Sequence, residues 1–94
     1  MLIVSASPSF SRIAKKLHAK DKLVLDNAVQ WITANHQHGE EKKGDLAGVF
    51  VNKFKLNHQE TLLAYELKPD KLNPSELVLL AVGPHENFYA ALKR

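Results

Sequence analysis

Cysteine is absent from this 94-residue sequence, which excludes a disulfide scaffold, a thiolate zinc site and a cysteine nucleophile. No apolar run approaches the roughly 20 residues of a membrane span. No basic segment precedes the short apolar start, so a signal peptide is not expected. We therefore predict a cytoplasmic protein that does not bind a membrane. It is expected to fold as one domain over residues 1–94, because a chain of this length buries little beyond one core.

Motifs for several common chemistries are also missing. The chain has neither the GxGxxG motif of dinucleotide-binding folds nor the GxxxxGK motif of phosphate-binding loops, and it has no GxSxG nucleophile elbow. His36 and His38 precede Glu40 and Glu41, which are metal-ligating residue types, but they fall in a polar segment without a second cluster. We expect neither a metal nor an organic cofactor.

Charge is distributed unevenly, and arginine is scarce. Residues 11–22 carry a net charge of +4 and residues 56–92 a net charge of −3, and a second basic group lies between them (Lys42, Lys43, Lys53 and Lys55). Such an asymmetry can orient a protein on a polyanion. The alternative is that these lysines only cover solvent-facing surfaces. Among the 13 basic residues, the arginines are Arg12 and Arg94.

The N-terminal segment predicts a strand followed by a helix. Leu2–Ala6 is short, apolar and partly β-branched, as expected of a strand. Apolar residues then recur at helical spacing up to about His18. The N-cap of this helix is either Ser9, or Ser7 followed by Pro8 in the first turn.

The next segment repeats the helical spacing of apolar residues. A second helix is expected to start after Asp21 as its N-cap and to end at Asn35. Two amphipathic helices with a short connection should form an antiparallel hairpin. Trp31 is expected to anchor that hairpin.

The apolar period then changes from 3.6 to 2, which indicates strands. Three strands are predicted, separated by a turn and a longer loop (Val49–Leu56, Thr61–Leu67 and Glu76–Val82), with Tyr65 in the core, and a helix follows at His85–Lys93. The order β-α-α-β-β-β-α predicts an α+β fold. Its last three strands should form an antiparallel meander, covered on one face by the helical hairpin.

His85 and Tyr89 are four residues apart, so a helix would place them on one face. Histidine exchanges protons near neutral pH, and a tyrosine hydroxyl can donate a proton or hold a phosphate oxygen. Together with lysines, this pair could cleave RNA by attack of a 2′-hydroxyl on its own phosphate. The alternative is a helix-capping histidine beside a half-buried tyrosine.

Four segments in this order resemble the RelE/ParE superfamily, the toxins of bacterial type II toxin–antitoxin modules. They are KKGDLAG at 42–48, KFK at 53–55, LLAY at 62–65 and GPHENFY at 83–89. The resemblance covers essentially the whole chain and implies a curved antiparallel sheet with a helical hairpin, similar to microbial ribonucleases.

The resemblance also implies activities and partners. RelE-like members bind the ribosomal A site and cut the mRNA there, whereas ParE-like members inhibit DNA gyrase and have lost the nuclease residues. A cognate antitoxin neutralises the toxin, and the complex commonly represses its own operon, so operator DNA is expected to be contacted only through the antitoxin.

Carried onto this sequence, the resemblance implies a catalytic role for His85 as acid or base and for Tyr89 at the phosphate. Lys53 and Lys55 lie on the strand that supplies basic catalytic groups, and Lys43 is near a further basic position. The leading hypothesis is therefore a metal-independent endoribonuclease, an mRNA interferase that arrests translation on the ribosome.

RNA binding is expected to involve Lys43 together with Arg12, Lys15 and Lys16 of the first helix. Nuclease members usually place one or two arginines on the central strands, where this chain has Thr61 or a neighbour. A lysine supplies the charge but not the planar fork that holds two phosphate oxygens. The missing arginines motivate two alternatives: a ParE-like gyrase inhibitor, and a degenerate toxin that only binds its antitoxin.

Overall fold

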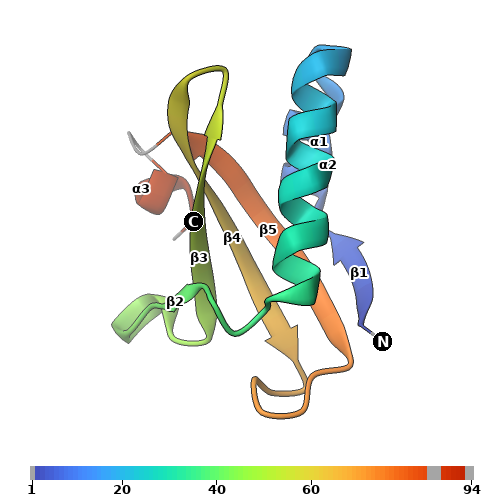
Figure 1. The fold of residues 1–94 in the computed structure, drawn as a ribbon. Coiled ribbons are helices and arrows are strands. Elements are labelled where there is room, and N and C mark those ends of the chain that lie inside the picture. Colours follow the sequence, from blue (N-terminus) through green and yellow to red (C-terminus); the bar gives the residue numbers. More distant parts are fainter. Residues whose placement is uncertain (1, 85–87, 93–94) are drawn as a thin grey trace.

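The computed structural model describes residues 2–84 and 88–92, which form a five-stranded sheet with helices on both faces (Figure 1). The elements in chain order are β1 (Ile3–Ala6), α1 (Pro8–Lys15), α2 (Ala19–Ala34), β2 (Glu40–Glu41), a 3-10 turn (Gly44–Leu46), β3 (Val49–Leu56), β4 (Gln59–Lys68), β5 (Glu76–Pro84) and α3 (Phe88–Leu92). The predicted α+β fold is confirmed. Of the predicted terminal helix His85–Lys93, residues 85–87 and 93 lie outside the described residues.

The strand order in the sheet is β1-β5-β4-β3-β2. The predicted meander is confirmed, because β3, β4 and β5 pair antiparallel with their neighbours in sequence. Two features differ from the prediction. β1 lies parallel to β5 and makes the sheet mixed, and the two-residue strand β2 was not predicted. β2 is too short to show a period of 2 in the sequence, which explains why it was missed.

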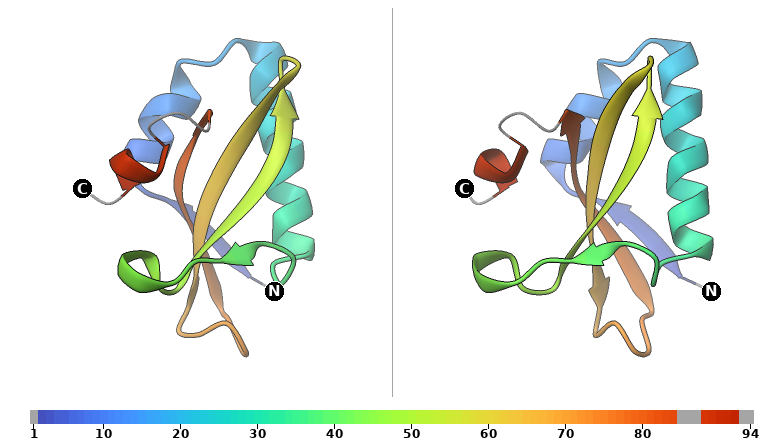
Figure 2. Two further views of the ribbon diagram at one scale, coloured as in Figure 1. Left: turned by 90° about the vertical axis from the view of Figure 1, so that its left-hand side faces the viewer. Right: turned by 60° about the vertical axis from the view of Figure 1, so that its left-hand side comes forward.

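Alternate side chains of the sheet fill two separate apolar clusters. The first cluster includes Leu63 and Tyr65 and is covered by residues of α1 and α2; the second includes Leu62 and Ala64 and is covered by Phe88 of α3. Figure 2 shows α2 on one side of the sheet and α3 on the other. The central strand β4 is therefore buried on both faces.

A β-bulge in β5 changes which residues of that strand face each cluster. Tyr65 pairs with Leu79 and Ala64 with Ala81, which leaves Leu80 as the extra residue. As a result Leu79 and Val82 both lie in the first cluster although they are three residues apart, whereas Leu80 and Ala81 pack against the second.

The helix boundaries differ from those predicted. α1 ends at Lys15 rather than near His18, and His18 is the N-cap of α2. Asp21 was wrong as the N-cap: it lies inside the first turn of α2, where its charge still interacts favourably with the helix dipole. Trp31 was wrong as an anchor, because it is 45% exposed and contacts the His38 ring edge-on, with centroids 5.1 Å apart.

The helices are held instead by residues that face the sheet. Leu25 and Ile32 are the buried residues of α2, and Phe10 is the buried residue of α1. These side chains meet the first cluster, so α1 packs on β5 and α2 on β3. Within the described residues, no helix has the length and apolar character needed to cross a membrane.

Ser7 fixes the corner between β1 and α1, which decides between the two predicted caps in favour of Ser7 with Pro8. Its Oγ accepts a hydrogen bond from the Phe10 amide at 3.1 Å and donates one to the Leu80 carbonyl at 2.8 Å. Its own amide donates to the Leu79 carbonyl at 2.8 Å. One serine therefore joins the start of α1 to the bulge of β5.

Replacing Ser7 with alanine should destabilise the protein by about 1 kcal/mol or slightly more, because both the cap and the bond to the bulge are lost. Urea denaturation measures this cost. The control is Ser9→Ala, which changes an exposed serine two residues away. Equal stability of the two variants would contradict the assigned cap.

Tyr65 is fully buried, as predicted, and it joins β4 to the segment that follows α2. Its hydroxyl donates a hydrogen bond to the His36 carbonyl at 2.8 Å, and its ring stacks on Phe50 with centroids 5.5 Å apart. Burial raises the pKa of Tyr65, and a hydrogen bond from the Gly39 backbone partly opposes that rise. A Cβ at Gly39 would overlap the Tyr65 hydroxyl, so this close approach requires glycine.

Gly39→Ala should lower the free energy of unfolding by about 1–3 kcal/mol, because the new methyl group collides with a fully buried side chain. The cost should shrink in a Tyr65→Phe background, where the hydroxyl oxygen is gone. Chemical denaturation of the two single variants and the double variant measures the coupling. Gly83→Ala is the control, since a Cβ there meets nothing within 4 Å. Strictly additive costs would refute the contact.

Candidate functional site

The candidate site lies where β2 meets β3, on the face of the sheet that carries α3. Glu40 pairs with Val51 and Glu41 with Phe50. Residues that lie directly opposite each other in paired strands point to the same face of the sheet. Glu40 therefore shares the face of Val51, which belongs to the second apolar cluster. Lys42 follows on the same side as Glu40, and its amide is fixed to the Val49 carbonyl at 2.8 Å.

Four side chains form what we call the Lys42 cluster: Glu40, Lys42, Lys53 and Tyr89. The Lys42 ammonium is 2.7 Å from a Glu40 carboxylate oxygen and 5.1 Å from the centroid of the Tyr89 ring. Tyr89 packs edge-on against Phe88, with centroids 5.3 Å apart. Phe88 is buried in the second cluster and thereby fixes α3 on the sheet.

The charges of the cluster influence one another. The hydrogen bond from Lys42 and then its positive charge hold the pKa of Glu40 below its ordinary value, and the charge of Lys53 acts in the same direction. The hydrogen bond to Glu40 raises the pKa of Lys42, and a side-chain hydrogen bond with Tyr89 adds to that rise against the effect of burial. The cluster therefore holds charged Lys42 beside a tyrosine hydroxyl.

Two of the predicted catalytic residues, Lys53 and Tyr89, are members of the Lys42 cluster. Lys53 and Lys55 are exposed on β3 and share a face with Val51, because they lie two and four residues beyond it. Among the described residues, β2 pairs only with Phe50 and Val51, so β3 beyond Val51 is an open edge. Lys53 acts on Glu40, whereas Lys55 lies further along the strand, opposite Glu60.

The other predicted site residues are not part of the Lys42 cluster as the structure describes it. His85 is outside the described residues. Lys43 is exposed and precedes the 3-10 turn as its N-cap. The predicted RNA-binding residues of α1 and its C-cap are all exposed (Arg12, Lys15 and Lys16). Since α1 packs on β5, with β4 between β5 and β3, these residues form a basic surface separate from the Lys42 cluster.

Thr61, where a strand arginine was expected, is 4% exposed and pairs with Phe54, which packs against the first cluster. It therefore lies on the face opposite Tyr89. Its hydroxyl donates to the Gln59 carbonyl at 3.1 Å. The next residue, Leu62, faces the second cluster and is fully buried. Neither position supplies a cation to the site.

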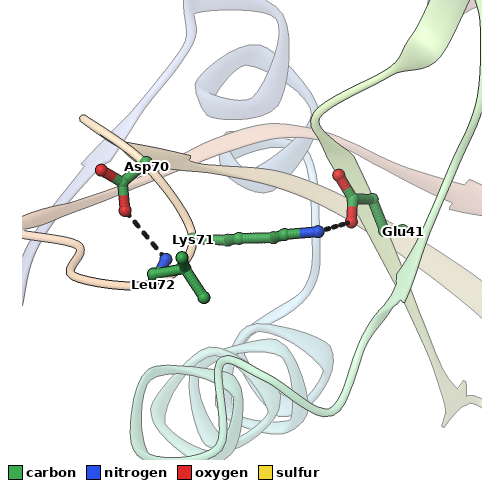
Figure 3. Close-up of polar contacts among 4 residues, drawn as sticks. All are labelled: Glu41, Asp70, Lys71 and Leu72. Carbon is green, nitrogen blue, oxygen red and sulfur yellow. Dashed lines mark hydrogen bonds and ion pairs between the residues drawn. The ribbon is translucent and has the colours of Figure 1, made fainter.

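Lys42 was missed as a site residue because its segment was interpreted as a polar loop. The signal was the spacing of Glu40 and Lys42, which places two opposite charges on one side of a strand. The neighbouring Glu41 points the other way and binds Lys71 at 2.7 Å (Figure 3). Within residues 2–84 and 88–92, no group of three or more His, Cys, Asp or Glu residues could hold a metal ion.

A second feature of this region is a groove of about 620 Å³ beside α3. Its apolar lining comes from α1, the 3-10 turn, β3, β5 and α3 (Ile13, Leu46, Val49, Leu80, Phe88 and Leu92), and Asp45 and Glu66 add negative charge. The groove and the Lys42 cluster share α3, so a partner in the groove would also meet the element that carries Tyr89.

Comparisons with known proteins agree with this architecture. One chain of the crystal structure of the intact E. coli RelBE toxin–antitoxin complex has the same fold, with a TM-score of 0.68 and 14% sequence identity, over 92% of this chain and 99% of that chain. The family model of the ParE-like toxin of type II bacterial toxin–antitoxin systems matches residues 4–93. A search of the curated proteins finds no match.

The fold and the match over nearly the whole chain define a toxin of a type II toxin–antitoxin system. This chain belongs to the ParE-like toxin family, within the RelE/ParE group that its sequence resembles.

Replacing Lys42 with methionine should raise the pKa of Glu40 toward its ordinary value of 4.5, because the carboxylate loses its main hydrogen-bond donor and nearest positive charge. Carbon-detected NMR of the Glu40 carboxyl group across an acid titration measures the shift. Lys71→Met is the matched control and should leave Glu40 unchanged, since Lys71 pairs with Glu41. Identical titration curves for the two variants would disprove the Lys42–Glu40 pair.

Proposed function

We propose that this toxin is a RelE-like, ribosome-dependent mRNA endonuclease that cuts without a metal. The observation that carries the proposal is the contact of Lys42 with Tyr89. Lys42 also binds the Glu40 carboxylate, whose pKa is lowered by the charge of Lys53 as well. Attack of a 2′-hydroxyl on the adjacent phosphate needs a proton acceptor, a proton donor for the leaving 5′-oxygen and positive charge beside the phosphate oxygens.

The proposed roles follow from the chemistry of each group. His85 is the proposed general acid or base, Tyr89 holds or protonates a phosphate or leaving-group oxygen, and Lys53 and Lys55 stabilise negative charge. Lys43 extends the basic edge beyond the cluster. The exposed basic face of α1, with Arg12, Lys15 and Lys16, is proposed to contact ribosomal RNA.

The proposed protein partner is a cognate antitoxin, since one chain of the E. coli RelBE toxin–antitoxin complex shares this fold. The apolar groove beside α3 supports this, because a segment with an apolar face would bury Ile13 and Leu92 there. Binding of that kind next to Tyr89 would inhibit the toxin by covering the site. Operator DNA would then be contacted only through the antitoxin.

The second candidate is inhibition of DNA gyrase by protein–protein contact. It is favoured by one observation: the positions expected to hold an arginine are a buried threonine and a buried leucine. A gyrase inhibitor needs no phosphate-binding cation at this site, so the Lys42 cluster would then serve only to hold α3 on the sheet.

Induction in bacteria should produce new mRNA 5′ ends within translated regions, mapped by primer extension. Tyr89→Phe should reduce the cleavage rate roughly 10²-fold, the contribution expected of one acid–base group. Phe88 remains in that variant, so α3 stays packed on the second cluster. A gyrase supercoiling assay is run in parallel with the purified toxin. Growth arrest with intact transcripts and inhibited gyrase would replace the proposal with the second candidate, and absence of arrest would indicate a degenerate toxin.

A further inference from the structure

Lys42 is more restrained than a surface lysine normally is. Its side chain is 25% exposed, against 55% for Lys71, and it lies between the Glu40 carboxylate and the Tyr89 ring. Its backbone is fixed by the hydrogen bond to Val49. A lysine ordinarily loses much rotamer freedom when it binds a ligand, but folding has already ordered this one. Lys42 is therefore preorganised to hold an anion.

The anion that Lys42 now holds is largely exposed to solvent. The Glu40 side chain is 72% exposed. An ion pair with one partner in solvent contributes little to stability, so exchange of one oxyanion for another costs little. A phosphodiester oxygen carries the same kind of charge and accepts the same hydrogen bond.

Two cations act on that carboxylate, and a tyrosine hydroxyl lies beside the first of them. The hydrogen bond and charge of Lys42 lower the pKa of Glu40, and the charge of Lys53 acts more weakly in the same direction. Tyr89 approaches Lys42 from α3. The Glu40 carboxylate thus lies against Lys42 and within reach of the charge of Lys53.

We infer that Lys42 is the main phosphate-binding residue of the nuclease site, and that the Glu40 carboxylate occupies the position of a phosphate oxygen until RNA displaces it. The inference rests on the proposed function and assigns to Lys42 the positive charge that the missing strand arginines would supply. Lys42 supplies that charge as a single point rather than a planar fork. Glu40 limits the affinity of the free protein for polyanions that are not substrate.

The test is an NMR titration with a single-stranded 2′-O-methyl oligoribonucleotide, which cannot undergo 2′-hydroxyl attack. Resonances of the Lys42 side chain and the Tyr89 ring should shift saturably. Lys42→Ala should weaken binding about tenfold, the loss expected for one charge-assisted hydrogen bond. Lys42→Arg should restore affinity, and Glu40→Gln should tighten binding several-fold, because it removes the competing carboxylate.

The opposite face supplies matched controls, because Lys71 and Glu41 form an ion pair of the same length, 2.7 Å. Figure 3 shows Lys71 reaching across to Glu41, while Asp70 binds the backbone of the same loop. Lys71→Ala and Glu41→Gln change the net charge by the same amounts as the test variants. They should alter affinity little.

Three results would overturn the inference: no saturable shift at Lys42 in the wild-type protein, equal losses for Lys42→Ala and Lys71→Ala, or no gain of affinity in Glu40→Gln. These results are separate from a failure of the proposed function. Wild-type toxin that leaves translated mRNA intact refutes the nuclease, whereas a toxin that cleaves mRNA but binds the oligonucleotide independently of Lys42 refutes this inference alone.

Discussion

The hydrogen bond from the Tyr65 hydroxyl to the His36 carbonyl is the constraint on which the candidate site depends. It holds the segment after α2 against β4, and Gly39 passes directly over the hydroxyl. That segment leads into β2, which places Glu40 and Lys42 on the side of the sheet where α3 lies. A buried side chain on one face thus sets the position of a charged cluster on the other.

One face of the sheet stabilises the fold, and the other face carries the candidate site. The first cluster, with α1 and α2, holds most of the large buried side chains and stabilises the fold. The second cluster is smaller and carries a short helix, so α3 depends mainly on Phe88 for its position. A segment held by few buried contacts opens more readily than the core. Tyr89 therefore lies on one of the elements that a partner can most easily cover or move.

The sequence predicted the features that depend on long apolar patterns. β3, β4 and β5 show period-2 or continuous apolar runs, and the burial of Tyr65 followed from its place in such a run. Helix ends were less predictable, since the N-cap of α2 makes no side-chain hydrogen bond that a residue type could signal. The exposure of Trp31 was missed because helical spacing alone does not say which flank of the stripe meets the sheet.

The candidate site was only partly visible in the sequence. Tyr89 and Lys53 were selected by residue type and resemblance, and the structure brings both to Lys42 and Glu40. The position of Lys42 depends on β2, a strand of two residues. This strand forms because it pairs with the edge of β3, and its own residues show no strand pattern. Long-range pairing of this kind is not encoded in local periodicity.

We propose that the edge carrying Lys42 and Tyr89 acts on an RNA phosphate in the ribosome. A cryo-EM reconstruction of a translating ribosome with the toxin, on mRNA that carries a 2′-O-methyl group at the A-site codon, tests it most directly. We expect the toxin in the A site, with the Lys42 ammonium within hydrogen-bonding distance of an mRNA phosphate oxygen and Glu40 turned away. Ribosomes without bound toxin, or toxin bound with this edge facing away from the mRNA, would contradict it.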